Sequence, residues 1–435
     1  MELFEAKNLK VSLYDKGTTI REIAAEKVKV QTDPEREELD DPFFIFDIGD
    51  VIAKDRQWRD LLPSVETFYA VKSNPDPVIV KLMLALGRGF ECASKNEIQM
   101  VLDLGASPEN VIFAHPYKQE SHIRFVQEKG VRKMTFDTEE ELYKVKRIYP
   151  GAELVLRIIY DSKTAMFVTG VKFGCHEEDV LPLLTLAKKL ELDVVGVSFY
   201  IGTELQDKDV FEGVIQYVSP MFKLGRSLGL SMNLLDLGGG FPGRLRPKTP
   251  FEEFADSIKM SLAKHFPPSR GVRVVAEPGT FYTRSAGWLL ANIMAKRFYK
   301  GPQGVQNVVQ NGEGDVKNVE EYPVMMYYLN VGIYNSLLMS FLDQTYFDLP
   351  EPLKTSRKDA DLKLSRLWGP TGDGDDVIVT RCMLPDMDAG DFLIISDAGG
   401  YTTTCATTFN GFCIPKTCYI APQETRSVLE EAFPL

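Results

Sequence analysis

The sequence has few of the residues that build metal sites and disulfide frameworks. Its six cysteines include no CxxC pair, and its four histidines show no zinc-ligand spacing. Isolated cysteines in a chain of 435 residues are typical of a reducing compartment. We therefore expect neither a metal site nor disulfide bonds.

Positive charge is also scarce. The chain has 50 lysines and arginines against 62 aspartates and glutamates, which gives a net charge of −12. A nucleic-acid-binding protein needs a basic face, so this composition argues against nucleic acid as a partner. An acidic surface is a common solubility feature, and a basic protein partner is the alternative.

Long apolar runs are missing as well. No run reaches the roughly 18 residues that a membrane span needs. The N-terminal residues MELFEAKNLK contain no apolar stretch of the signal-peptide type. We expect a cytoplasmic protein that contacts no membrane. Its length and its hydrophobic content of 44% favour a globular protein of two domains.

Residues 42–285 alternate between two kinds of segment. Short runs rich in β-branched and aromatic residues are predicted strands, among them FFIFDI, TFYAV, GFECAS, ELVLRI and LLDLGGG. Between them lie amphipathic stretches with helical spacing, such as VLPLLTLAKKL. Repeated strand–helix alternation implies parallel strands, and about eight units over this length predict a closed (β/α)₈ barrel.

The pattern of predicted strands and helices changes after residue 285. Runs such as MMYYLNVGIY and GDFLIISDAGGY are predicted strands without long helices between them. We therefore predict an antiparallel β domain over residues 286–435, to which residues 1–41 also belong. A Gly- and Asn-rich segment at 300–321 is predicted to be a surface loop.

Three features follow predicted barrel strands, where barrel enzymes place their active sites. Lys72 ends the strand in FYAVKSN, where desolvation would make its amine a nucleophile. Gly238, Gly239 and Gly240 follow LLDL, and adjacent glycines let backbone N–H groups converge on a phosphate. The alternatives are a lysine that only marks the end of a strand and a tight glycine turn.

A second strand end, AEPGT, places Glu277 and Gly279 at the same face of the predicted barrel. Phosphate sites of barrels commonly lie in the loops after the later strands. A carboxylate beside a bound pyridine ring would keep the ring nitrogen protonated. The alternative for Glu277 is a carboxylate that caps a helix or a turn.

Together these motifs resemble the ornithine decarboxylase family over residues 10–420. The matching segments are FYAVKSN, GFECASKNE, MTFDTEEELYKV, VKFG, LDLGGGFPG, AEPGT, YYLNVGIYNS, WGPTGDGDD and the AGGYT…FNGF tail. The resemblance implies a pyridoxal 5'-phosphate (PLP) barrel of the alanine racemase type with a C-terminal β domain. It also implies a head-to-tail homodimer with composite active sites.

The resemblance implies a role for each matching residue. Lys72 would bind PLP covalently, Glu277 would pair with the ring nitrogen, and Tyr401 would join the three glycines at the phosphate. Further matches are Arg157 and Glu97 in the pocket, Tyr334 in the active site, and Asp343 and the other subunit's Asp373 at the distal amine of ornithine. Lys172 with Asp376, and Asp137 with Arg297, match ion pairs between subunits.

The chain departs from the family at the cofactor. Tyr200 stands where the family has a histidine stacked on the ring, and Thr203 replaces a phosphate-binding serine. Glu204 replaces a glycine, which puts a carboxylate near a phosphate unless it points away. Thr280 replaces the phosphate-binding arginine, a contact worth about 1.5–3 kcal/mol. We expect weakened rather than abolished PLP binding.

Other departures concern the substrate. Gly372 stands at the position of the family's catalytic cysteine, and Leu342 replaces a tyrosine of the diamine pocket. Val331 replaces an aspartate.

These departures leave three hypotheses. The chain is a PLP-dependent decarboxylase of an aliphatic L-amino acid such as leucine, an inactive antizyme-inhibitor-like regulator of polyamine metabolism, or an ornithine decarboxylase. The segment Tyr117–Tyr143 resembles the family's antizyme-binding region and is otherwise an ordinary exposed helix and strand.

Overall fold

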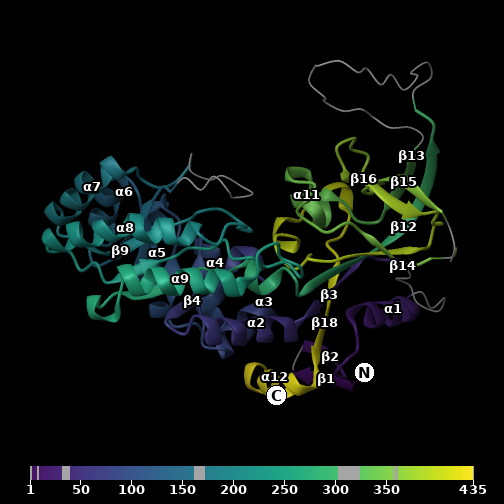
Figure 1. Cartoon of the computed structure of the whole chain (residues 1–435), viewed down its shortest axis with the longest axis horizontal. Coiled ribbons are helices and arrows are strands. Elements are labelled where there is room, and N and C mark those ends of the chain that lie inside the picture. Colours follow the sequence, from purple (N-terminus) through teal and green to yellow (C-terminus); the bar gives the residue numbers. More distant parts are fainter. Residues whose placement is uncertain are drawn as a thin grey trace. The chain divides into compact units, whose positions relative to one another are not determined.

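The computed structural model describes residues 2–6, 9–31, 40–160, 172–301, 324–355, 357 and 361–434 (Figure 1). The expected loop at 300–321 lies almost wholly outside these residues. The chain divides into two compact units. What we call the barrel unit comprises Glu5–Leu9, Ile48–Arg284 and Glu424–Leu435, and the β unit comprises Met1–Phe4, Lys10–Asp47 and Ser285–Gln423.

The barrel unit contains a closed barrel of eight parallel strands, which confirms the predicted (β/α)₈ fold. Its strands are β4 (Val65–Ala70), β5 (Gly89–Cys92), β6 (Val111–Phe113), β7 (Lys133–Phe136), β8 (Glu153–Ile158), β9 (Asp193–Phe199), β10 (Leu234–Asp236) and β11 (Arg273–Ala276). The helices are α2 (Ile48–Leu61), α3 (Pro77–Ala85), α4 (Lys95–Asp103), α5 (Glu120–Lys129), α6 (Glu139–Ile148), α7 (Glu177–Lys189), α8 (Val210–Ser227), α9 (Phe251–His265), α10 (Thr280–Thr283) and α12 (Arg426–Ala432).

Local sequence explains where the barrel helices begin. The side chain of Asp76 accepts the N–H of Val78, and Pro77 occupies the first position of α3. Helix α6 begins after Thr138, whose hydroxyl accepts the N–H of Glu141. Acidic residues fill its first turn and basic residues its last, in agreement with the helix dipole. No helix in the described ranges is long and apolar enough to cross a membrane.

The strand register decides which side chains share a level inside the barrel. The buried cluster of the interior includes Phe68, Val155 and Leu234. Side chains alternate along a strand, so residues two positions further on face the interior as well. At that next level Ala70 aligns with Glu91, and Arg157 aligns with Ser198 and Asp236. Charged residues therefore fill the carboxyl end of the barrel, above an apolar layer.

The β unit is built on a sheet ordered β1-β2-β18-β3-β12-β13-β15-β16, with β17 and β14 branching from β12. Its strands are β1 (Glu2–Ala6), β2 (Leu9–Tyr14), β3 (Phe43–Asp47), β12 (Gly287–Tyr299), β13 (Val324–Leu329), β14 (Glu351–Lys354), β15 (Leu362–Trp368), β16 (Val377–Pro385), β17 (Phe392–Ile395) and β18 (Lys416–Pro422). Among its described residues, the α-helices are α1 (Ile20–Gln31) and α11 (Leu338–Leu342).

The prediction of a wholly antiparallel sheet needs correction. Strand β18 runs parallel to both β2 and β3, and β13 runs parallel to β15. Strands β2 and β3 lie about 400 and about 370 residues before β18 in the sequence, so no tight hairpin forces their directions to alternate. The sheet is therefore mixed.

The boundary of the barrel also differs from the expected 42–285. Strand β3 pairs with β12 and β18 in the β unit, whereas the barrel closes with strands β4 to β11. Every residue of β3 is buried, and a short fully apolar run does not distinguish a barrel strand from the centre of another sheet. Helix α12, expected in the β domain, contacts α3 in the barrel unit.

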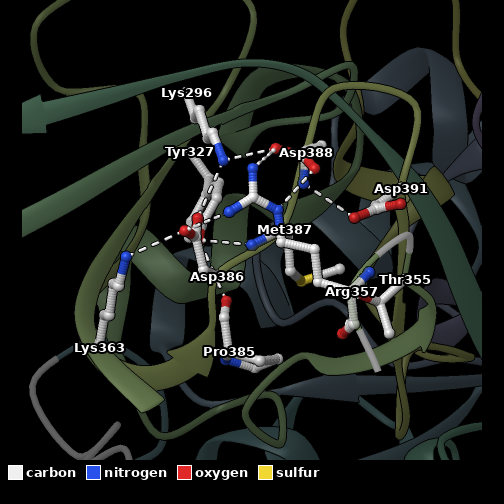
Figure 2. A network of polar contacts seen from close by, with 10 residues as sticks. All are labelled: Lys296, Tyr327, Thr355, Arg357, Lys363, Pro385, Asp386, Met387, Asp388 and Asp391. Atoms are coloured by element: carbon white, nitrogen blue, oxygen red, sulfur yellow. Dashed lines mark hydrogen bonds and ion pairs between the residues drawn. The ribbon is translucent and has the colours of Figure 1, made fainter. Parts of the chain in front are cut away.

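A network of charges lies in the β unit (Figure 2). Lys296 on β12 and Arg357 each contact both Asp386 and Asp388, which follow β16. Lys363 on β15 contacts Asp386. The segment after β16 is thereby held to β12 and β15.

Candidate active site

Lys72 lies at the carboxyl end of the barrel, as predicted. It belongs to the short 3₁₀ helix η1 (Val71–Ser73), which directly follows β4. Its ammonium group forms an ion pair with Glu91, the buried carboxylate at the end of β5. The Lys72 side chain is 39% exposed, so it is only partly buried. Glu91 was not among the residues predicted from the sequence, although it is a charged residue within the apolar run GFECAS.

Two more carboxyl groups lie at this end of the barrel. Burial raises the pKa of Glu277 well above its usual value, and the neighbouring Asp236 and Glu91 raise it further. Burial also raises the pKa of Asp236 to about 6, and its Oδ1 accepts the N–H of Gly238 at 2.9 Å. These carboxyls resist ionisation together unless a cation lies beside them.

The three consecutive glycines form a backbone cradle after β10. Gly238 and Gly240 have φ angles of +61° and +100°, which residues with side chains rarely adopt. A Cβ atom on Gly238 would lie 2.1 Å from the carbonyl oxygen of Phe199. Within the described part of the chain, the N–H groups of Gly239 and Gly240 donate no hydrogen bond to a protein acceptor. They are available to an anion.

Glu204 does not project as a lone carboxylate into this cradle. Its Oε1 lies 3.0 Å from Nη1 of Arg284, and both side chains are buried. Both of its carboxylate oxygens accept the N–H of Gly243. Thr280 is also buried and begins α10, with Gly279 as its N-cap. Arg284 was not among the residues predicted from the sequence, although it is an arginine only four residues after Thr280.

Tyr200 is held from two directions in the loop after β9. Its hydroxyl shares a hydrogen bond with that of Thr203. The guanidinium carbon of Arg157 lies 5.8 Å from the Tyr200 ring centroid and 5.5 Å from that of Phe173. The aromatic ring expected to stack on the cofactor is therefore oriented by neighbours on β8 and in its own loop.

Two predicted pocket residues have structural partners in the barrel unit. The carboxylate of Glu97 accepts the N–H of Ala93 at 2.6 Å, which makes it part of the cap of α4. The carboxylate of Asp137 accepts the N–H of Gly174 at 2.6 Å. Burial raises the pKa of both groups.

The β unit carries the predicted substrate residues. The Tyr334 hydroxyl donates a hydrogen bond to Asp373, which raises the pKa of Tyr334 to about 12. The Tyr334 ring lies 4.6 Å from that of Phe409. Asp343 ends α11, and its Oδ1 accepts both the N–H and the hydroxyl of Thr345 at 2.7 Å.

Three substitutions relative to the family also lie in the β unit. Leu342 is 59% exposed beside Asp343. Gly372 is exposed, and a Cβ atom there would meet nothing within 4 Å. Val331 is fully buried and belongs to the core of the β unit.

The remaining residues of the β unit that were predicted to lie in the active site or the dimer interface are Tyr401, Asp376 and Arg297. Tyr401 adopts a left-handed φ of +53° in the turn after β17. Asp376 is buried and accepts the N–H groups of Ile333 and Thr371. Arg297 is exposed on β12. The ion pairs expected between subunits, Lys172 with Asp376 and Asp137 with Arg297, stay predictions.

Comparison with known proteins places the chain in a family. Residues 48–284 match the family described as "Pyridoxal-dependent decarboxylase, pyridoxal binding domain". The chain is 39% identical to an ornithine decarboxylase from Rattus norvegicus, over 99% of this chain and 91% of that protein. It is 38% identical to antizyme inhibitor 2 from Xenopus laevis, over 95% of this chain and 87% of that protein.

Solved structures share the fold over nearly the whole chain. The arginine decarboxylase of Paramecium bursaria Chlorella virus is 29% identical with a TM-score of 0.81, over 92% of this chain and 100% of that one. A lysine/ornithine decarboxylase from Vibrio vulnificus, complexed with cadaverine, is 27% identical with a TM-score of 0.76, over 92% and 99%.

The residues at the end of the barrel fit PLP with one exception. Lys72 provides an amine, Glu277 a carboxyl suited to a cationic ring nitrogen, and the glycine cradle two N–H groups for a phosphate. The exception is Thr280, which offers no cation to the phosphate. On the motifs, the fold and the comparisons, the chain belongs to the ornithine decarboxylase family of PLP-dependent decarboxylases.

Proposed function

We propose that this chain is a working carboxy-lyase that decarboxylates an aliphatic L-amino acid such as leucine, releasing CO₂ and the primary amine. The observation that carries the proposal is the carboxyl end of the barrel. Lys72, Glu91, Asp236 and Glu277 gather there with a glycine cradle, in which the N–H groups of Gly239 and Gly240 donate to no acceptor among the described residues. A regulator that binds no cofactor would not need these charges.

The chemistry divides between the cofactor and the chain. PLP, when bound, accepts the electron pair that the departing carboxylate leaves on the substrate. Lys72 holds the cofactor, and Glu277 keeps a proton on the ring nitrogen. The N–H groups of Gly239 and Gly240 hold the phosphate, and Tyr200 packs against the ring.

The β unit supports an aliphatic substrate. Asp343 and Asp373 match the carboxylates that would hold a distal ammonium group. Each is already engaged, Asp343 by Thr345 and Asp373 by Tyr334. Leu342 adds apolar surface beside Asp343, and Gly372 leaves open space where the family has a thiol. A branched apolar side chain suits such a surface better than a second ammonium group.

The hydrogen bond between Tyr334 and Asp373 bears on the expected homodimer. Because the two side chains are joined within one chain, they belong to the same surface of the β unit. A partner subunit that supplies Asp373 to a composite active site therefore supplies Tyr334 with it.

Two alternatives remain, each favoured by a specific observation. An inactive antizyme-inhibitor-like regulator is favoured by Thr280 and by the 38% identity to antizyme inhibitor 2 from Xenopus laevis. In that case the segment Tyr117–Tyr143, whose two terminal tyrosines are exposed, would bind antizyme. An ornithine decarboxylase is favoured by the retained Asp343 and Asp373 and by the 39% identity to the rat enzyme.

The deciding experiment is a cofactor titration of the purified protein followed by borohydride reduction and mass analysis of peptides. We expect a visible absorbance band and a pyridoxyl adduct on Lys72. CO₂ release from leucine and from ornithine then separates the two enzyme hypotheses. The absence of both the band and the adduct would overturn the enzyme hypothesis, and antizyme binding would then be the next measurement.

A further inference from the structure

Glu204 and Arg284 form a buried ion pair beside the glycine cradle. Glu204 lies in the loop after β9, and Arg284 directly follows α10. The two charged groups lie 3.0 Å apart, and their side chains are 5% and 0% exposed. Two charges removed from water at this depth cost free energy that their mutual attraction must offset.

The pair spans three loops that touch backbone to backbone. A Cβ atom on Gly243 would lie 2.1 Å from the carbonyl oxygen of Thr280, at the start of α10. A Cβ atom on Gly240 would lie 2.5 Å from the carbonyl oxygen of Gly202. The N–H of Leu205 donates to the carbonyl oxygen of Gly240 at 3.0 Å. The loops after β9, β10 and β11 are thus packed without intervening side chains.

Glu204 joins all three of these loops. It belongs to the first, it accepts the N–H of Gly243 in the second, and it pairs with Arg284 after the third. Its backbone has a φ of +51°, a conformation that residues other than glycine, asparagine and aspartate rarely adopt. Such backbone strain persists where the surrounding structure holds it, commonly at functional sites.

We infer that Glu204 and Arg284 are positioning residues for the phosphate group of the cofactor. The pair holds the N–H groups of Gly239 and Gly240 in the arrangement that binds phosphate, in a chain whose Thr280 supplies no cation. Preorganised donors lose less free energy on binding than donors that must first be ordered. The inference rests on PLP occupying this site and is independent of which amino acid is the substrate.

The test compares PLP with pyridoxal, which lacks the phosphate. Dissociation constants for both are measured with the wild type, Glu204→Gln, Arg284→Met and the double variant. The matched control is Arg88→Met. Arg88 pairs at 2.8 Å with the fully buried Asp55, and it precedes β5 at the opposite end of the barrel.

Each single variant is expected to bind PLP about tenfold or more weakly, because small displacements of a binding group have large effects. Pyridoxal binding should stay as in the wild type. The control should lower the Tm and leave the ratio of the two dissociation constants unchanged. The double variant should regain much of the Tm, since no buried charge is left unpaired, while its preference for PLP stays reduced.

Single variants that lower the Tm but keep the wild-type preference for PLP would overturn the inference. Tighter PLP binding by Glu204→Gln would overturn it too, since the carboxylate would then only repel the phosphate. A wild type that binds neither compound defeats the proposed function instead. Hydrogen exchange of residues 201–205 and 238–243 then decides: faster exchange in both single variants but not in Arg88→Met supports positioning, and unchanged exchange refutes it.

Discussion

Acidic side chains gather in two regions of this molecule, and the charges that surround them differ. In the β unit, Asp386 and Asp388 are surrounded by cations. At the carboxyl end of the barrel, Glu91 pairs with Lys72. The charge of Lys72 also favours ionisation of Glu277, and that of Arg157 favours ionisation of Asp236. The two clusters contain the same chemical groups with opposite electrostatic outcomes.

The β-unit cluster is balanced. Asp386 contacts Lys296, Arg357 and Lys363 (Figure 2). Each of the three distances is 2.9 Å. Hydrogen bonds from Lys296 and Lys363 lower the pKa of Asp386 below its usual value. Such a cluster is complete without a ligand, and it serves to hold strands and loops together.

The barrel cluster is not balanced. Burial and neighbouring carboxylates raise the pKa of Glu277 and of Asp236, the latter to about 6. Buried carboxyls whose pKa values are raised in this way are suited to a bound cation, and a protonated ring nitrogen is one. The carboxyls of the binding site therefore differ from those of the scaffold in the direction of their pKa shifts.

The largest expected effect separates two lysines that each pair with a carboxylate. Lys72→Ala should abolish the borohydride-trapped adduct and reduce decarboxylation by on the order of a thousandfold or more. Lys363→Met removes a lysine from the balanced cluster and should retain both. The measurements are peptide mass analysis and CO₂ release. Equal losses in the two variants would contradict the distinction between the clusters.

The next effect concerns the phosphate end of the site. Thr280→Arg restores a cation there and should tighten PLP binding by about tenfold or more, the value of a charge-assisted hydrogen bond. Thr280→Val keeps the size of the side chain and serves as the control. Absorbance titration measures both dissociation constants. Unchanged affinity in Thr280→Arg would mean that the cradle already supplies what the phosphate requires.

A smaller change is expected in substrate preference. Leu342→Tyr combined with Gly372→Cys restores both of the family's side chains at exposed positions of the β unit. The ratio of kcat/KM for ornithine to that for leucine should rise about tenfold, as expected when pocket contacts change. The control is Leu342→Tyr with Gly372→Ala, which adds volume without the thiol. A ratio that does not move in either variant would show that other residues select the substrate.

The sequence predicted the barrel and the place of its site for a physical reason. Parallel strands bring their carboxyl ends to one face, so Lys72 and Glu277, each just after a strand, had to lie at the same end. Contacts between distant loops carry no such periodic signal. The pairs Lys72–Glu91 and Glu204–Arg284 join residues on different strands or loops. Which two residues pair depends on the strand register and the loop packing, so the pairs could not be predicted from the sequence.

The predicted start of the barrel, at residue 42, differs from the structure for a related reason. The run FFIFDI has the apolar pattern of a barrel strand, yet β3 lies in the β unit. Burial on both faces is common to both locations, so composition could not choose between them. The parallel pairing of β18 likewise depends on chain ends that meet only in the folded protein.

The smallest expected effect is an opposite response of the two clusters to pH in the cofactor-free protein. The folded pKa of Asp236, about 6, lies above its ordinary value of 3.8, so its contribution becomes destabilising as pH rises through this window. Asp236→Asn can still accept the N–H of Gly238. It should raise stability at pH 7, because a buried carboxyl whose folded pKa lies above its ordinary value is destabilising once it ionises.

At pH 4 the gain from Asp236→Asn should largely vanish, because the carboxyl is then mostly protonated in the folded chain. Asp386→Asn is the counterpart. The folded pKa of Asp386 lies below its ordinary value, so its stabilising contribution is present above that value and is lost as pH falls. This variant should lower the Tm at pH 7 and have less effect in acid. Tm measured at both pH values tests the pair, and shifts of the same sign at pH 7 would contradict the contrast between an unbalanced site and a balanced scaffold.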